Sequence, residues 1–218
     1  MIEDNINYEY IIRYLREMTD DKDSLLRELR RYAEENDVPV SQRETSAFLQ
    51  FLCAVKQPKR ILEIGTAIGY SAIAMAKCCQ AEIVTLERDE TMIAKAKENI
   101  SKARLEERIT LIEGDATQTL SSVTGSFDLV FVDAAKGQYD VFLQQIEVSD
   151  GGVLVCDNVL YKGMTATDEL VVRRKITIVK RLREFLNTLM NDESYVTSLL
   201  PLGDGVALAY KKGCDKHE

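Results

Sequence analysis

The chain has 218 residues, of which 45% are hydrophobic and 29% are charged, a composition that predicts one globular domain, residues 1–218, with a substantial core. Its net charge of −8 argues against general nucleic-acid binding, and no apolar run approaches the roughly 20 residues of a membrane span. The acidic N-terminus does not resemble a signal peptide, and five cysteines without metal-ligand spacing predict free thiols and a cytoplasmic location.

The only histidine, His217, lies in the charged C-terminal tail. This position argues against a Ser-His-Asp triad, a Cys-His pair and a histidine-rich metal site. Any metal must therefore be held by oxygen ligands, which favours a hard ion such as Mg²⁺.

The first 57 residues are predicted to form a helical cover. Helical periodicity covers residues 5–18 and 22–36, an extended connector follows at 38–41, and a third helix runs over about 42–55. The apolar face of the first helix, which includes Tyr10, Tyr14 and Met18, is expected to cover the sheet or a dimer partner. The alternative is that these helices form a lid over a site.

From residue 60 to residue 212, strand and helix patterns alternate, and residues 213–218 form a tail. The predicted strands are 60–65, 82–88, 109–114, 127–134 and 152–157, followed by a hairpin of 195–202 and 205–211. The predicted helices are 70–78, 90–103, 116–122, 138–147 and 171–190. Strands that are apolar on both faces and separated by helices predict a parallel sheet covered on both sides. The fold class is therefore α/β: a Rossmann-like sheet of seven strands, mostly parallel, with an antiparallel C-terminal hairpin and added N-terminal helices.

A glycine turn at Gly65 and Gly69 joins the first of these strands to a helix. This arrangement is the usual cradle for the polar part of a nucleoside cofactor. Glu87 lies 22 residues after Gly65, at the end of the second strand, where an acid accepts hydrogen bonds from ribose hydroxyls; an exposed strand-end carboxylate is the alternative. The close second glycine of a dinucleotide fingerprint is missing, and Glu63 adds negative charge. A zwitterionic or cationic ligand is therefore favoured over a diphosphate.

Each parallel strand delivers an acidic residue to one edge of the sheet, and these residues are Glu63, Glu87, Asp115, Asp133 and Asp157. Carboxylates gathered in this way must be bound to something, because otherwise they would repel each other. Asp157 and Asn158 follow a fully apolar strand, where a dry core would leave them unsatisfied. Asp128, near the start of its strand, is expected to be structural.

Three segments carry a resemblance to a known family. Leu-Glu-Ile-Gly-Thr-Ala-Ile-Gly-Tyr-Ser at 62–71, Asp-Ala-Ala-Lys at 133–136 and Asp-Asn at 157–158 resemble the cation-dependent O-methyltransferases of the catechol and caffeoyl-coenzyme A type. The similarity covers about residues 40–212. It implies the class I methyltransferase fold, S-adenosylmethionine as cofactor, and Mg²⁺ or another hard divalent cation.

The resemblance also implies roles for individual residues. Asp133, Asp157 and Asn158 would bind the metal, and Lys136, with Asp133, would be catalytic, Lys136 as the general base or charge-stabilising residue. The implied cofactor-binding residues are Ser41, Glu63, Gly65, Thr66, Gly69, Tyr70, Ser71, Glu87, Arg88, Gly114, Asp115, Ala116 and Asp133.

The chemistry of methyl transfer is consistent with these roles. Transfer from sulfonium to oxygen needs in-line attack by an activated oxygen. A metal bound by two carboxylates and an amide keeps positions open for two neighbouring substrate oxygens, and it lowers the pKa of a hydroxyl that it binds. Lys136 lies three residues after Asp133, so it can face the same hydroxyl. A solvated surface lysine is the alternative interpretation.

The acceptor is the least determined part of the hypothesis. Segments 61–71, 133–139, 157–163 and 201–205 are similar to bacterial tRNA 5-hydroxyuridine methyltransferases, which implies methylation of a wobble uridine to 5-methoxyuridine. A basic patch near Arg173, Arg174 and Lys175 would bind phosphates, or form a solvated helix face. Tyr139 and Tyr161 would stack on a base, or simply pack.

Three further expectations complete the hypothesis. A small catechol-like phenol is the competing acceptor. A scaffold protein without activity is disfavoured, because the metal set and Lys136 are intact. The family often forms dimers, so a homodimer is predicted.

Overall fold

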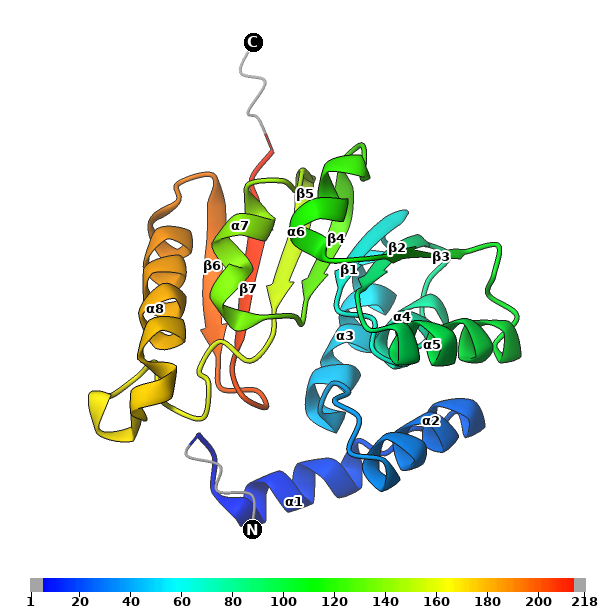
Figure 1. Cartoon of the computed structure of the whole chain (residues 1–218), viewed down its shortest axis with the longest axis horizontal. Coiled ribbons are helices and arrows are strands. Elements are labelled where there is room, and N and C mark those ends of the chain that lie inside the picture. Colours follow the sequence, from blue (N-terminus) through cyan, green and yellow to red (C-terminus); the bar gives the residue numbers. More distant parts are fainter. Residues whose placement is uncertain (1–5, 214–218) are drawn as a thin grey trace.

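Seven strands form one sheet in the order β3-β2-β1-β4-β5-β7-β6 (Figure 1). The strands are β1 (Arg60–Ile64), β2 (Glu82–Glu87), β3 (Ile109–Glu113), β4 (Phe127–Val132), β5 (Val148–Cys156), β6 (Tyr195–Leu200) and β7 (Val206–Lys211). The first five pair in parallel, and β7 lies antiparallel between β5 and β6. The predicted seven-stranded α/β sheet with its C-terminal hairpin is confirmed.

The structure, a computed structural model, describes residues 6–213, so Cys214, His217 and most of the predicted tail lie outside the described residues. The helices are α1 (Glu9–Met18), α2 (Ser24–Glu35), α3 (Arg43–Lys56), α4 (Tyr70–Ala76), α5 (Glu90–Lys102), α6 (Ala116–Thr119), α7 (Tyr139–Leu143) and α8 (Ile176–Asn191). None of the helices within residues 6–213 has the length and hydropathy needed to cross a membrane.

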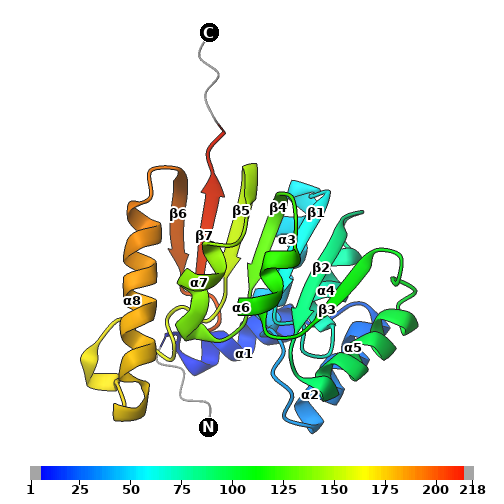
Figure 2. The ribbon, with the colours of Figure 1, turned by 45° about the horizontal axis from the view of Figure 1, so that its top comes forward.

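The sheet is covered on both faces, as its apolar strands predict. Alternate residues of each central strand enter different cores: Ile61 packs with α2, α3, α4 and α5, whereas Leu62 packs with α7 and α8. Figure 2 shows α6, α7 and α8 in front of the sheet and α3 and α4 behind it. The N-terminal helices α1 and α2 lie at the end of the sheet where β4 and β5 finish (Figure 1).

Several element boundaries differ from the prediction, and α8, for example, begins at Ile176, five residues later than expected. Helix α7 ends at Leu143, not at 147, and β5 begins at Val148, four residues earlier than expected. The pairing of β4 with β5 shifts register between Phe127 and Leu129. Gly152 permits this irregularity, because a Cβ there would lie 2.7 Å from the carbonyl oxygen of Ser149. Glycines that resemble a turn in the sequence therefore lie inside a bulged strand.

Of the two predicted roles of the α1 apolar face, covering the sheet is wrong for the described chain, and covering a dimer partner stays a prediction. Tyr10, Tyr14 and Met18 are 68%, 62% and 68% exposed, and within α1 only Ile12 is buried. Arg16 instead turns toward α3, where its Nε donates a hydrogen bond to Glu44 Oε2 at 3.3 Å. Amphipathic periodicity identifies an apolar face, but it does not show whether anything packs against that face.

Candidate active site

A cavity of about 340 Å³ opens at the carboxyl ends of the parallel strands, within the range of small-molecule sites. We call it the first cavity. The predicted residues that line it are Ser41, Gly65, Thr66, Tyr70, Ser71, Glu87, Arg88, Gly114, Asp115, Ala116, Asp133 and Lys136. Four of the proposed site residues do not line it, namely Glu63, Gly69, Asp157 and Asn158.

Gly65 has to be glycine because β1 and β4 end against each other. Its φ is +102°, and a Cβ would lie 2.1 Å from the carbonyl oxygen of Asp133. The backbone N–H groups of Gly65 and Thr66 donate to the carbonyl of Leu86 at 3.0 and 3.2 Å, which fixes the turn between β1 and α4 against the end of β2. The turn therefore has one backbone shape, and that shape forms the floor of the first cavity.

Glu87 is held rigidly at the end of β2. Its carboxylate accepts hydrogen bonds from the backbone N–H groups of Ala67 at 2.8 Å, Arg88 at 2.9 Å and Asp89 at 3.0 Å. Two carboxylate oxygens offer about four acceptor positions, so accepting capacity is left for a ligand. This geometry fits the predicted contact with ribose hydroxyls, which stays a prediction.

Glu63 lies beneath the glycine turn and is fully buried. Thr85 Oγ1 donates to its Oε2 at 2.5 Å, whereas its Oε1 has no partner. The pKa of Glu63 is raised to about 7, mainly by burial and in smaller part by the nearby charges of Asp133 and Glu87, while hydrogen bonding with Ser71 and Thr85 opposes the shift. A buried carboxylate with one free oxygen favours a cationic ligand close by.

Ser41 gives a second unsatisfied oxygen, and unlike Glu63 it lines the first cavity. Its side chain is 4% exposed, its Oγ has no hydrogen-bond partner, and the residue lines the first cavity. Buried polar atoms without partners are rare in folded proteins. With Glu87 and Glu63, Ser41 therefore fits a site built for a polar nucleoside ligand that carries positive charge.

The three predicted metal ligands come together beside this cavity. Asn158 Nδ2 lies 3.5 Å from Asp133 Oδ1, and the Asn158 backbone N–H donates to Asp157 Oδ1 at 2.7 Å. Burial raises the pKa of Asp157 well above its usual value, and the charge of Asp133 raises it further. Burial also raises the pKa of Asp133, against the charge of Lys136. Two carboxylates and an amide group that lie this close together, with Asp157 buried, fit a hard cation.

This donor set is small. Among residues 6–213 there is no group of three or more His, Cys, Asp or Glu side chains that could hold a metal. Asp133, Asp157 and Asn158 would therefore leave positions of a bound ion to acceptor oxygens and water. Asn158 adopts φ +59°, a conformation that asparagine tolerates better than most residues.

Of the two alternatives predicted for Tyr139, packing is confirmed and stacking on a base is wrong. It is 1% exposed, and its hydroxyl donates to the carbonyl oxygen of Asp157 at 2.7 Å. Its ring packs edge-on against Phe185 of α8, with centroids 5.6 Å apart. Tyr139 thus ties the metal-ligand loop to α8.

A second cavity, of about 390 Å³, adjoins the first. It is lined by Ala134, Ala135, Lys136, Gly137, Gln138, Tyr161, Ile178 and Arg181. Lys136 lines both cavities, so its side chain stands where a cofactor and an acceptor would meet. Arg181 Nη1 donates to the carbonyl of Gly137 at 3.1 Å, and Lys175 Nζ lies 5.6 Å from the centroid of the Tyr161 ring.

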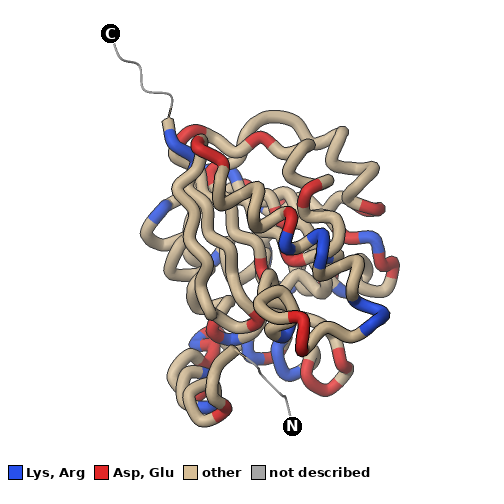
Figure 3. The backbone as a smooth tube through the Cα atoms, turned by 90° about the vertical axis from the view of Figure 1, so that its left-hand side faces the viewer, with Lys and Arg blue, Asp and Glu red and all other residues tan. Residues whose placement is uncertain are grey.

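The predicted basic patch lies next to the second cavity. Arg173, Arg174 and Lys175 form a 3₁₀ turn before α8, and none of them has a carboxylate partner among the described residues. In contrast, Arg183 pairs with Asp168 at 2.7 Å. Figure 3, which views the α8 side, shows basic and acidic segments interspersed rather than one continuous basic surface.

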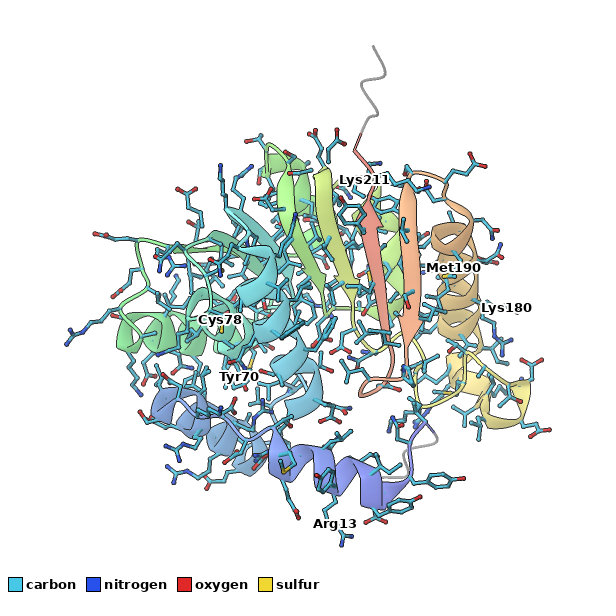
Figure 4. All side chains as sticks on the ribbon, turned by 180° about the vertical axis from the view of Figure 1, so that it is seen from behind. Arg13, Tyr70, Cys78, Lys180, Met190 and Lys211 are labelled. Carbon is cyan, nitrogen blue, oxygen red and sulfur yellow. The ribbon has the colours of Figure 1, made fainter. Side chains whose placement is uncertain are left out.

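Sequence reasoning missed the residues that support Tyr70. Tyr70 lines the first cavity, but its hydroxyl donates to Asp21 Oδ1 at 2.6 Å and is held by Arg30 of α2. Figure 4 shows Tyr70 between the sheet and the N-terminal helices. The available signal was an arginine among the buried leucines of α2, beside Leu26 and Leu29.

Comparisons with known proteins agree with this geometry. A sequence model of the O-methyltransferase family matches residues 16–212. A catechol O-methyltransferase of Niastella koreensis is 34% identical over 76% of this chain and 79% of that protein. A caffeoyl-CoA O-methyltransferase of Populus kitakamiensis is 29% identical over 78% and 76%. The crystal structure of an SAH-bound methyltransferase of Podospora anserina superposes with a TM-score of 0.85, at 32% identity over 94% of both chains.

Proposed function

Because the chain belongs to the O-methyltransferase family and is an S-adenosylmethionine-dependent O-methyltransferase, we propose that it methylates one of two adjacent hydroxyls on a catechol-type ring. The observation that carries this proposal is the position of Lys136, which lines both cavities close in sequence to Asp133 at the cavity wall, next to the buried Asp157. The names of the Niastella and Populus relatives favour a small aromatic acceptor.

S-adenosylmethionine is proposed to occupy the first cavity. Glu87, held by three backbone N–H groups, would accept from the ribose hydroxyls. The unpartnered oxygen of Ser41 would face the amino-acid end of the cofactor, and the charge of Glu63, which is buried nearby without lining the cavity, favours the positive groups of the cofactor. The methyl group would then point toward the boundary that Lys136 marks.

The acceptor is proposed to enter from the second cavity. Asp133, Asp157 and Asn158 would hold Mg²⁺ or another hard divalent cation. As a Lewis acid, the cation would lower the pKa of the acceptor hydroxyl. Lys136 would accept the proton of that hydroxyl or balance the oxyanion charge. Tyr161 and Ile178 give the second cavity an aromatic and an aliphatic wall, which suits a planar ring.

A second candidate acceptor is a 5-hydroxyuridine of tRNA, whose O5 and O4 are also adjacent. The observation in its favour is the unpaired basic turn of Arg173, Arg174 and Lys175 next to Tyr161. The net charge of −8 and the relatives named for catechol and caffeoyl-CoA make it the weaker candidate.

We also propose a homodimer and a cytoplasmic location. Exposed apolar side chains gather on α1, including Tyr10 and Tyr14, and on α3, at Phe51 and Val55. A larger apolar surface of this kind is typical of an interface, and light scattering that gives the mass of one chain would contradict the dimer.

The proposed cytoplasmic location rests on Cys53, Cys78, Cys79 and Cys156, which are free thiols.

The acceptor is tested with labelled S-adenosylmethionine and Mg²⁺. Three substrates are compared: 1,2-dihydroxybenzene, tRNA carrying 5-hydroxyuridine, and the same tRNA carrying uridine. Label in the dihydroxybenzene alone is the expected result. Label in the hydroxylated tRNA alone would replace the proposal with the RNA acceptor and make the basic turn its docking surface.

A further inference from the structure

A buried ion pair connects the N-terminal helices to the first cavity. Arg30 of α2 is 5% exposed, and its Nε donates to Asp21 Oδ2 at 2.7 Å. Its second terminal nitrogen donates to the hydroxyl of Tyr70, and its guanidinium lies 4.4 Å from the Tyr70 ring centroid. We call Asp21, Arg30 and Tyr70 the Arg30 cluster.

The same guanidinium reaches the wall of the first cavity. Arg30 Nη1 donates to the backbone carbonyl of Ser41 at 3.0 Å. Ser41 is the residue whose hydroxyl is buried at the cavity without a partner. Tyr70, the other end of the cluster, also lines the cavity, at the start of α4. One side chain therefore fixes two parts of the cavity wall that are far apart in sequence.

Stability of the fold is a weak explanation for such a cluster. Removing a guanidinium and a carboxylate from water is costly, and well-packed apolar side chains of similar size are often as stable. The cluster joins four chain segments, namely the turn before α2, α2 itself, the connector at 39–41 and the start of α4. A planar group with five donors can hold several acceptors in one fixed geometry, which apolar packing cannot do.

We propose that Arg30 is a positioning residue for the cofactor. Through the Ser41 carbonyl and the Tyr70 hydroxyl, it holds the 39–41 connector against the glycine turn, so that Ser41 Oγ faces the bound cofactor. The inference rests on the proposed placement of S-adenosylmethionine in the first cavity. It makes the N-terminal helices part of the cofactor site rather than only a cover or a dimer surface.

The test measures cofactor binding without turnover. Isothermal titration gives the Kd of S-adenosylhomocysteine for the full chain and for Arg30→Lys and Tyr70→Phe. Arg30→Lys keeps the positive charge but loses the planar guanidinium and its fixed donors, and Tyr70→Phe removes only the hydroxyl. Losing hydrogen bonds of this kind should raise the Kd about tenfold, while the acceptor KM stays within about twofold.

Two matched controls separate positioning from general destabilisation. Arg31→Lys changes the exposed arginine next in sequence and should leave the Kd unchanged. Ala33→Gly weakens the buried side of α2 without touching Ser41 or Tyr70, so it should lower the melting temperature and leave the Kd unchanged.

The outcomes differ clearly. A raised Kd for Arg30→Lys and Tyr70→Phe, but not for Ala33→Gly, supports the proposal. A wild-type Kd for Arg30→Lys, or an equal rise for Ala33→Gly, overturns it. Glu87→Gln and Ser41→Ala are measured in parallel: if both keep the wild-type Kd, the placement of the cofactor itself is wrong, and this inference fails with it.

Discussion

The two cavities are built in different ways. The first is shaped by backbone and buried groups: Gly65 cannot carry a side chain, Glu87 is fixed by three N–H groups, and Glu63 is fully buried. The second is walled by partly exposed side chains of a loop and of α8, such as Tyr161, Ile178 and Arg181. With the proposed placement of the two substrates, the fold itself determines cofactor binding, whereas acceptor choice depends on a few replaceable side chains.

Asp157→Ala should have the largest effect, and it should lower turnover without weakening cofactor binding. Substitutions of residues that only support a metal ligand typically cost 10–100-fold, so losing a ligand should lower kcat by more than about 100-fold. The Kd for S-adenosylhomocysteine should stay close to wild type, because Asp157 does not line the first cavity. Equal loss of turnover and of cofactor binding would show that Asp157 has another role.

Gly65→Ala should damage the first cavity and the fold together. The strain of a positive φ alone costs about 1–3 kcal/mol, and the contact of a Cβ with the Asp133 carbonyl adds to it. Urea unfolding should therefore show a loss of more than about 3 kcal/mol, with S-adenosylhomocysteine binding lost as well. Gly163→Ala, also at positive φ but outside both cavities, is the control, and it should reduce stability without a comparable loss of binding.

Glu63 should make the ligand-free protein less stable as pH rises. Its pKa is about 7 in the folded protein and about 4.5 unfolded, so the folded state holds the extra proton between these values. The stabilisation that this group contributes is fully present at and below about pH 4.5. It is lost as the pH rises to about 7, and the loss is at most about 3 kcal/mol.

Glu63→Gln supplies the control for this pH effect. The glutamine cannot ionise, so the difference in melting temperature between variant and wild type should grow in favour of the variant from pH 5 to pH 8. A constant difference across that range would mean that Glu63 titrates normally. Saturating S-adenosylhomocysteine should reduce the effect if its positive ammonium lies near the carboxylate.

Arg181→Gln should have the smallest effect and should act only on the second cavity. An exposed charge contributes about 0.2–1 kcal/mol, so the KM for a dihydroxybenzene bearing a carboxylate should rise by no more than about fivefold. The KM for uncharged 1,2-dihydroxybenzene and the Kd for S-adenosylhomocysteine should not change. Lys180→Gln, next to it on α8, is the matched control. A rise in the cofactor Kd for Arg181→Gln would contradict the separation of the two cavities.

Local sequence predicts those parts of the first cavity that depend on residues close together in the chain. The turn at Gly65, the strand-end position of Glu87 and the structural role of Asp128 all follow from short patterns. Asp128 indeed accepts hydrogen bonds from the backbone N–H groups of Lys59 and Arg60 at 2.8 and 3.0 Å. The fold class follows in the same way from alternating strand and helix patterns.

What the sequence could not predict depends on packing between distant segments. Tyr139 is buried because α8, more than 40 residues later, supplies Phe185. Arg30 meets Tyr70 only after α2 folds against α4. The exposed aromatic face of α1 shows the converse, since a strong helical pattern there finds no covering partner within the described chain.

The central claim is tested most directly by comparing two dihydroxybenzenes that differ only in the spacing of their hydroxyls. Label transfer from S-adenosylmethionine to 1,2- and 1,3-dihydroxybenzene is measured with Mg²⁺ and again after chelation with EDTA. We predict transfer to the 1,2-isomer only, and its loss with EDTA. Equal transfer to both isomers, or transfer that EDTA leaves unchanged, would contradict an acceptor held through two adjacent oxygens at Asp133, Asp157 and Asn158.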